Sequence, residues 1–224
     1  MIVRARATRE EEKIERRNEI LDAAERLFAD RPDGLPSMDE LALAAGVAKG
    51  TLYLYFPSKE EVLVALHERY LTGFFDRLRD ELHAKPRFSI EDLLELTRRE
   101  ILEEPVRISL ASLVVGLTER NLPPESSLRF KMALGERLID SGQGLGRAFG
   151  LDAETCTRLL SVSYGLVLGL WQLKGCMGSE RYHHLLDPAI ARAFVTEYPT
   201  ETMEALRTLW TGAIERSALQ GSST

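Results

Sequence analysis

A set of polar side chains between residues 37 and 59 is suited to contact the phosphate backbone of a nucleic acid. The set consists of Lys49, Thr51, Tyr53, Tyr55 and Lys59. Ammonium groups supply positive charge, and hydroxyl groups can donate hydrogen bonds to phosphate oxygens. Residues 41–59 contain no aspartate or glutamate, although the whole chain has a formal net charge of −6. This local pattern is typical of a basic contact surface, whereas the charge of the whole chain is not.

Two short helices joined by a glycine turn are predicted to hold these side chains. Ser37 and Glu40 have the Ser-x-x-Glu spacing of a capping box, which begins a helix. Gly46 supplies the backbone freedom that ends this helix and allows a turn. The second helix is expected from about residue 48 to 55, because Pro57 restricts the residue before it to extended backbone. The pattern predicts a helix, a tight turn and a second helix.

Such a helix-turn-helix can place its second helix in the major groove of DNA. The alternative interpretation is an ordinary helical hairpin inside a bundle. The second helix has Leu52 and Phe56 as its clear core residues, four positions apart. A bundle helix shows a wider apolar stripe, so the pattern favours the helix-turn-helix.

The segment from Val47 to Phe56, followed by Ser-Lys-Glu-Glu, resembles the recognition segment of TetR/AcrR-type transcriptional regulators. Residues 20–29 are similar to the first helix of that family. The resemblance covers about residues 14–74 and implies a DNA-binding domain there, with the helix-turn-helix at residues 37–56. It also implies a helical domain at residues 75–218 that binds an effector and forms a dimer.

The resemblance further implies which residues contact DNA. These are Ser37, Lys49, Gly50, Thr51, Tyr53, Tyr55 and Lys59. Lys49 and Gly50 match positions near base edges, and Lys59 matches a phosphate contact at a helix N-terminus. The chain departs from the family pattern in the loop before Ser37, where Pro32 and Pro36 put the shape of that loop in question.

The composition predicts an all-α fold. Leucine and alanine are abundant, and no segment shows sustained alternation of β-branched and polar residues. Beyond residue 57 the capping and proline signals predict helices at residues 58–82, 89–101, 105–117, 124–145, 152–173 and 199–214. The glycine-rich run at residues 141–150 does not have the spacing of a nucleotide-binding loop. We interpret it as a frayed or kinked helix end.

Small residues recur every four positions in the helix that begins near residue 152. Ser161, Gly165 and Gly169 form a groove where a second helix can come close. Together with Leu206 and Trp210 of the last helix, they match by position the dimer interface of the family. The alternative is that both helices complete the core of one chain. We expect a homodimer, because a helix-turn-helix protein needs two copies to read a palindrome.

The effector pocket is the least specific prediction, because apolar residues that line a pocket have the same pattern as a plain core. The candidates are Phe75, Leu113, Leu117, Met132, Tyr164 and Trp171. The effector is expected to be a small molecule, and its identity does not follow from the sequence.

Enzymatic chemistry finds no support in the sequence. We find no nucleophile–base pair, no isolated pair of carboxylates and no metal-ligand spacing, so no catalytic residue, metal or cofactor is predicted. His183 and His184 are adjacent and point to different faces of any helix. Cys156 and Cys176 lie near opposite ends of one predicted helix, roughly 30 Å apart at ~1.5 Å per residue, too far for a disulfide within the chain. A buried structural role is favoured over redox sensing for both.

The longest stretch without charge, residues 159–173, has 15 residues. A membrane-spanning helix needs ~20, and the charged N-terminus does not have the pattern of a signal peptide. The sequence therefore predicts a cytoplasmic protein with no membrane partner, specifically a ligand-responsive repressor that binds a palindromic DNA operator as a homodimer. The alternative function is a helical protein-interaction module without DNA binding.

Overall fold

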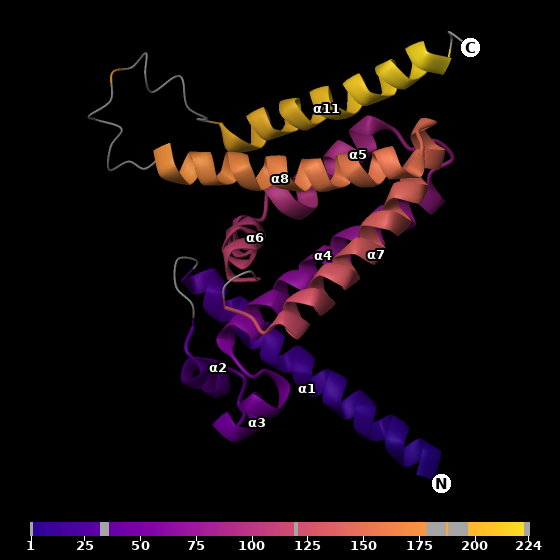
Figure 1. The fold of residues 1–224 in the computed structure, drawn as a ribbon. Coiled ribbons are helices and arrows are strands. Elements are labelled where there is room, and N and C mark those ends of the chain that lie inside the picture. Colours follow the sequence, from indigo (N-terminus) through magenta and orange to yellow (C-terminus); the bar gives the residue numbers. More distant parts are fainter. Residues whose placement is uncertain (1, 32–35, 119–120, 178–186, 188–196, 222–224) are drawn as a thin grey trace. The chain divides into compact units, whose positions relative to one another are not determined.

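The computed structural model describes residues 2–31, 36–118, 121–177, 187 and 197–221. Every regular element in these ranges is a helix, as the composition predicted (Figure 1). The elements are α1 (Ile2–Asp30), α2 (Met38–Ala44), α3 (Lys49–Tyr55), α4 (Lys59–Ala84), α5 (Ile90–Thr97), the π-helical turn η1 (Arg98–Leu102), α6 (Pro105–Thr118), α7 (Pro124–Phe149), α8 (Ala153–Met177) and α11 (Tyr198–Gly221). Pro32, His183 and His184 fall outside the described residues, as does the side chain of Cys176.

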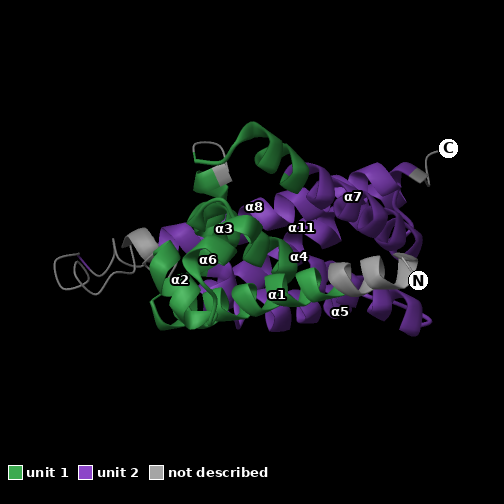
Figure 2. Ribbon diagram, turned by 90° about the horizontal axis from the view of Figure 1, so that it is seen from below, with its two compact units in different colours: residues 1–70, 109–130 green, residues 71–108, 131–224 purple. Residues whose placement is uncertain are grey.

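The chain divides into two compact units (Figure 2). Unit 1 comprises residues 1–70 and 109–130, and unit 2 comprises residues 71–108 and 131–224. Three helices, α4, α6 and α7, therefore contribute residues to both units. The division of the sequence into residues 14–74 and 75–218 remains a prediction about domains.

Unit 1 is built around one apolar face of α1, which packs on α2. Its fully buried residues include Ile20, Ala23, Ala24 and Phe28, spaced as one face of a helix. Polar contacts at the edge of this apolar face hold α4 beside α1. The guanidinium of Arg69 lies 2.5 Å from both Asp22 Oδ1 and Glu25 Oε2, and Tyr70 Oη donates a hydrogen bond of 2.7 Å to Glu25.

Unit 2 is held together by α11, which packs on α8 and α5 (Figure 1). Two large side chains of α11 are buried against α8 and also satisfy their polar atoms there. Tyr198 Oη donates to the carbonyl oxygen of Val167 at 3.2 Å, and Trp210 Nε1 donates to Ser163 Oγ at 3.0 Å. Both aromatic rings thus add hydrogen bonds to the area that they bury.

Helix α7 continues through the glycine-rich run as far as Phe149, so the expectation that this end is frayed was wrong. The glycines serve close packing instead. A β-carbon on Gly142 would collide with Thr157 Oγ1 and lie 2.9 Å from the carbonyl oxygen of Ala153. At Gly146 it would lie 2.8 Å from the carbonyl oxygen of Leu151. These two glycines let α7 approach the backbone at the start of α8.

Candidate nucleic-acid interface and internal cavity

The turn between α2 and α3 has the predicted geometry. Ser37 Oγ accepts a hydrogen bond from Glu40 N at 3.2 Å, and the backbone N–H of Ser37 donates to Glu40 Oε2 at 2.9 Å, which completes the capping box. The hydrogen bond from Ser37 N, together with one from Arg31, lowers the pKa of Glu40 to about 2. Gly46 has φ of 65°, a left-handed conformation that suits glycine. The chain thus turns sharply from α2 into α3.

Helix α3 is anchored on one side only. Leu52 is fully buried, and Phe56 lies in the core beneath the guanidinium of Arg17, 5.1 Å from its ring centre. The opposite side is open to solvent: Tyr53 is 44% exposed and Leu54 is 82% exposed. This division agrees with the narrow apolar stripe seen in the sequence.

The predicted DNA-contact residues all lie in unit 1: Ser37 caps α2, residues 49–55 lie on α3, and Lys59 lies at the start of α4. Lys49 and Gly50 are exposed, and Thr51, Tyr55 and Lys59 are half-buried. Lys59 is the first residue of α4. The structure therefore gathers these residues on neighbouring elements, while their contact with DNA remains a proposal.

Lys49 forms an ion pair that the sequence did not predict. Its Nζ lies 2.6 Å from Asp39 Oδ1 of α2, and this hydrogen bond raises the pKa of Lys49. Both side chains are well exposed, so the pair adds little stability. It does orient the ammonium group toward α2. The signal in the sequence was the acid at position 39, ten residues upstream, which only the turn brings close.

Unit 2 contains an apolar cavity of about 200 Å³ that is partly open to solvent. It is lined by Leu71, Phe74, Phe75, Leu93, Leu94, Thr97, Ile101, Leu134, Leu138, Leu160, Ser161, Ser163, Tyr164, Val167, Leu206 and Trp210. Two predicted pocket residues, Phe75 and Tyr164, are among them. The others are not: Leu113 and Leu117 belong to unit 1, and Met132 is 57% exposed.

Trp171, the remaining pocket candidate, is also not part of this lining. Its ring stacks edge-on against Tyr198 with centroids 5.1 Å apart, and Lys174 Nζ lies 5.2 Å from the ring centre. Periodicity could not separate these four residues from cavity residues, because both kinds are apolar positions on helices.

Among the residues that the structure describes, no charged side chain lines the cavity, and the polar groups in its wall largely form hydrogen bonds within the chain. Thr97 Oγ1 donates to the carbonyl oxygen of Leu93 at 2.8 Å, and Ser161 Oγ donates to that of Thr157 at 3.1 Å. Burial raises the pKa of Tyr164 to about 12, so its hydroxyl is neutral near pH 7. The cavity is suited to a hydrocarbon group rather than to an ion.

Comparison with known proteins agrees with this architecture in both parts of the chain. Residues 20–66 match the family profile described as bacterial regulatory proteins, tetR family, and residues 68–217 match the one described as tetracyclin repressor-like, C-terminal domain. The chain belongs to the TetR family. It is thus a member of a family of helix-turn-helix transcriptional regulators, as the recognition segment indicated.

Individual relatives of this TetR-family chain match mainly its N-terminal part. It is 52% identical over 50 residues to the HTH-type transcriptional regulator EthR of Mycobacterium tuberculosis, which covers 22% of this chain and 23% of EthR. It is 34% identical over 67 residues to the fatty acid metabolism regulator protein of Bacillus subtilis, covering 30% and 34%. Thermus thermophilus FadR, solved in complex with lauroyl-CoA, shares the fold with a TM-score of 0.56 at 23% identity, covering 87% of this chain and 93% of FadR.

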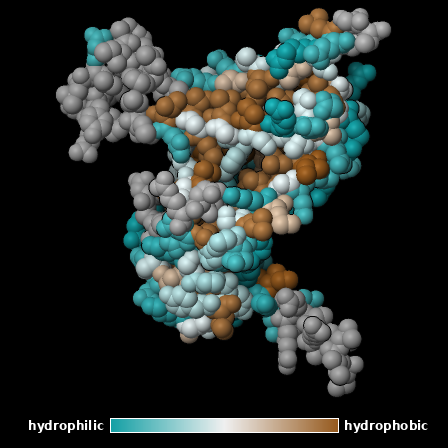
Figure 3. Space-filling view, in the orientation of Figure 1, coloured by the Kyte–Doolittle hydropathy of each residue, from teal (hydrophilic) through white to brown (hydrophobic). Residues whose placement is uncertain are grey.

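The TetR-family chain has an apolar surface along α8 and α11 (Figure 3). Val162 and Leu173 of α8 are 54% and 49% exposed. A β-carbon added at Gly165 or Gly169 would meet nothing within 4 Å, so the small-residue groove is open in the single chain. Ser161 is exposed on the same helix. Helix α8 therefore carries the open part of the predicted interface.

The two α11 residues assigned to that interface need correction. Leu206 and Trp210 are 2% and 1% exposed and line the cavity of their own chain. The alternative interpretation, that these residues complete the monomer core, holds for this pair. Sequence periodicity missed the distinction because α11 has apolar residues on more than one side.

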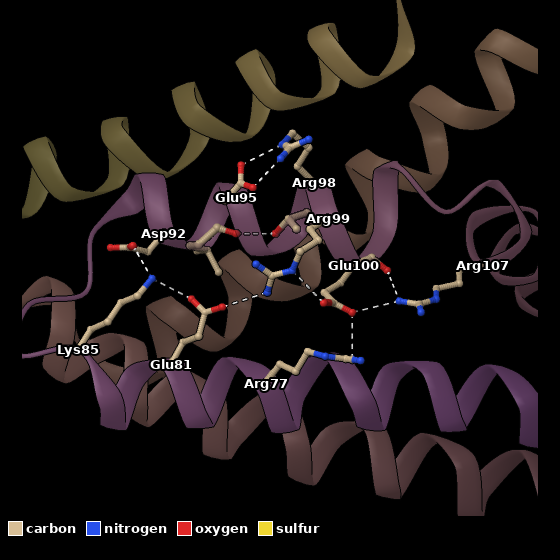
Figure 4. A network of polar contacts seen from close by, with 11 residues as sticks. Arg77, Glu81, Lys85, Asp92, Glu95, Arg98, Arg99, Glu100 and Arg107 are labelled. Atoms are coloured by element: carbon tan, nitrogen blue, oxygen red, sulfur yellow. Dashed lines mark hydrogen bonds and ion pairs between the residues drawn. The ribbon is translucent and has the colours of Figure 1, made fainter.

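A polar network joins α4 to the segment formed by α5 and η1 (Figure 4). The buried carboxylate of Glu100 lies 2.9 Å from Arg77, 3.1 Å from Arg107 and 3.1 Å from Arg99. Burial raises the pKa of Glu100, but the hydrogen bonds from Arg99 and Arg107 and the charges of Arg77 and Arg107 together bring it below its ordinary value. Because Thr97 and Ile101 on the same segment line the cavity, the network fastens one cavity wall to α4.

Cys156 is buried, and burial together with Asp152 raises the pKa of its thiol to about 11. A thiol in that state is a poor nucleophile, which favours the structural role. Within the described ranges, no cluster of three or more metal-ligating side chains occurs. Among the same residues, no helix is long and apolar enough to cross a membrane.

Proposed function

We propose that this TetR-family protein is a ligand-responsive repressor that binds a palindromic DNA operator as a homodimer and releases it when a fatty acyl ligand occupies the cavity of unit 2. Such a regulator acts where the chromosome lies, in the cytoplasm. The observation that carries the DNA-binding part is the exposed side of α3, with Tyr53 and Leu54 open to solvent and no acidic residue between positions 41 and 59.

Dimer formation is supported by the open groove of α8. An exposed apolar helix surface is covered in most soluble proteins, and Gly165 and Gly169 leave room for the backbone of a second helix. A two-fold dimer also presents two copies of α3 to successive half-sites on one side of the duplex.

The ligand class is supported by two independent observations. The cavity has no charged residue in the part of its lining that the structure describes, and the hydroxyl groups of Thr97 and Ser161 in its wall form hydrogen bonds within the chain. A relative is named a fatty acid metabolism regulator, and a structural neighbour was solved with lauroyl-CoA. We therefore assign the cavity to the acyl chain of a fatty acid or its thioester.

Release of DNA would depend on α4, the helix that contributes residues both to unit 1 and to the cavity of unit 2. Leu71, Phe74 and Phe75 of α4 line the cavity, and the same helix begins at Lys59 beside α3. A ligand that favours another position of α4 lowers DNA affinity. By linkage, DNA lowers ligand affinity by the same factor.

The test is a titration of fluorescently labelled DNA from upstream of the protein's own gene, with and without acyl-CoA of increasing chain length. We expect operator binding that weakens steeply with salt, because phosphate contacts release counterions, and release by acyl-CoA. A Leu138→Phe variant, which narrows the cavity, should keep operator binding and respond less to the longer chains. Equal affinity for operator and random duplex at moderate salt would overturn the DNA-binding part. An unaltered operator affinity across all chain lengths would overturn the ligand class.

A further inference from the structure

Leu54 is an unusual residue for its position. It lies in the middle of α3, yet 82% of its surface is exposed. Leu52, two positions earlier, is fully buried. The two leucines differ because residues two positions apart lie about 200° from each other around the helix axis. The chain thus places a large apolar side chain on the side of α3 that faces away from the core.

The neighbouring position on the same side of α3 has no side chain. Gly50 lies one helical turn before Leu54, and residues four apart share a helix face. A β-carbon added at Gly50 would meet nothing within 4 Å. A surface of this kind, smooth at Gly50 and apolar at Leu54, can approach the floor of a groove closely.

Charges around this surface suit DNA rather than an apolar protein partner. The exposed Lys49 precedes Gly50, and no acidic residue lies within positions 41–59. Leu54 also borders a shallow groove of unit 1, whose other walls include Lys13 and Arg17 of α1 together with acidic residues of α4. When a protein lies in a groove of DNA, cationic side chains can contact the phosphate backbone while an exposed apolar side chain contacts the base edges.

The polar candidate for base contact is already engaged. Lys49 Nζ lies 2.6 Å from Asp39, so its hydrogen bond to a base would replace an existing one. Leu54 has no such competing contact to give up. Burial of its side chain against a base would remove apolar surface from water, which is favourable.

We infer that Leu54 is a specificity residue that reads the C5 methyl group of thymine in the major groove. Thymine is the base that presents a methyl group there, and apolar side chains distinguish it by contact with that group. The inference rests on the proposed DNA-binding function, and it adds a base preference that the hydroxyl and ammonium groups of α3 do not explain.

The test combines a protein change with an atomic change in DNA. An operator is first obtained by selection from a random library with the wild-type protein. Each thymine of the operator is then replaced by deoxyuridine, which removes only the methyl group. Affinities are measured for the wild type, Leu54→Ala and Leu43→Ala. Leu43 is the matched control, because it is 85% exposed but lies on α2.

At one thymine in each half-site, we expect the loss of the methyl group to weaken wild-type binding about fourfold per half-site, the effect of one buried methyl group. Leu54→Ala should be insensitive to the same replacement. Leu43→Ala should respond like the wild type. Unchanged melting temperatures of both variants would confirm that the leucines have no role in the core.

Equal responses of the wild type and Leu54→Ala at every thymine would overturn this inference and leave DNA binding intact. A selected operator without a preferred thymine would do the same. Absence of any selected operator would overturn the proposed function and this inference together. If the effect of removing a thymine methyl group disappears in Leu43→Ala and not in Leu54→Ala, the base contact belongs to α2 and the inference is wrong.

Discussion

Lys59 and Tyr53 belong to different parts of the proposed DNA interface and should behave differently when changed. Lys59 begins α4, where an ammonium group and a helix N-terminus both suit a phosphate. We expect Lys59→Ala to weaken binding to all sequences about equally and to reduce the salt dependence by roughly one charge. Tyr53→Phe should instead change the preferred operator sequence. Titrations at several salt concentrations and a repeated selection measure the two effects.

Lys131→Ala is the control for this comparison, since Lys131 is an exposed lysine of unit 2. It should leave both the salt dependence and the selected sequence unchanged. An unaltered salt dependence in Lys59→Ala would remove Lys59 from the phosphate contacts.

His67 makes the stability of the fold sensitive to acid. It is 3% exposed in α4, and burial lowers its pKa to about 4 from an ordinary value of 6.5. Between these two values the unfolded chain binds a proton that the folded chain does not. The free energy of unfolding therefore falls as pH decreases through this window, by on the order of 3 kcal/mol for this group.

Urea unfolding of the parent and of His67→Leu between pH 7 and 4.5 measures this contribution. Carboxylates titrate in both proteins, so the difference between the two slopes isolates the histidine. We expect the variant to lose less stability over the window. Parallel pH profiles would mean that His67 is protonated in the folded state.

At the scale of single helices, α7 offers two glycines with opposite expected effects. Gly142→Ala would force a β-carbon against Thr157 and the backbone of Ala153, and overpacking of this kind costs about 1–3 kcal/mol. Gly135, in the same helix, has nothing within 4 Å of its added β-carbon. Gly135→Ala should stabilise the helix by up to about 1 kcal/mol. Thermal unfolding of both variants measures the two effects. A lower melting temperature for Gly142→Ala alone would show that the close contact with α8 outweighs helix propensity at that position.

Glu100 ties η1 to α4 and α6, and its loss should cost more than that of an exposed ion pair. Glu100→Gln leaves Arg77, Arg99 and Arg107 without the buried carboxylate, and we expect a loss of about 1–2 kcal/mol in the free energy of unfolding. Glu95→Gln, which breaks an exposed ion pair with Arg98, is the matched control. We expect it to lower the free energy of unfolding by less than about 0.5 kcal/mol. Equal losses in urea unfolding would show that the burial of Glu100 adds nothing.

Local signals predicted the helices well where the cause of a boundary lies within a few residues. Ser37, Pro57 and Pro105 act on their own neighbours, and α2, α3 and α6 have the predicted positions. The glycine run of α7 was misread because its role depends on Thr157 and Ala153, which only folding brings to it. The turn η1 was not predicted, since its hydrogen bonds leave no pattern in the sequence.

The candidate sites show the same limit. The recognition segment is contiguous, so its residues and their neighbours could be identified together. The cavity is assembled from six elements, and apolar periodicity marks core and cavity alike. Leu206 and Trp210 were assigned to a partner surface from the position of their helix in the family, although they are buried within their own chain.

At the scale of the whole molecule, the open groove of α8 allows a test of the proposed link between dimer formation and DNA binding. Gly165→Leu fills the space at Gly165 with a side chain that would hold a partner helix away, at a cost of about 1–3 kcal/mol or more. We expect the variant to shift from dimer toward monomer in sedimentation at micromolar concentration, with unchanged helicity. Operator affinity should fall although α3 is untouched, because one half-site supplies only part of the binding energy.

Gly135→Leu on α7 is the control, since it adds the same side chain at another open position. It should leave the dimer and operator affinity unchanged. A parent protein that sediments as a monomer, or a Gly165→Leu variant that remains fully dimeric, would place the interface elsewhere.

The one-sided anchoring of α3 has a consequence for how such a regulator can diverge. Leu52 and Phe56 hold the helix in place, whereas Gly50 and Leu54 have no part in the core. Substitutions at the outward positions therefore leave the free energy of unfolding nearly unchanged. Under the base contact that we infer for Leu54, a duplicated copy of the gene could acquire a new target sequence through these positions without compensating changes in the interior. A protein engineer could follow the same route.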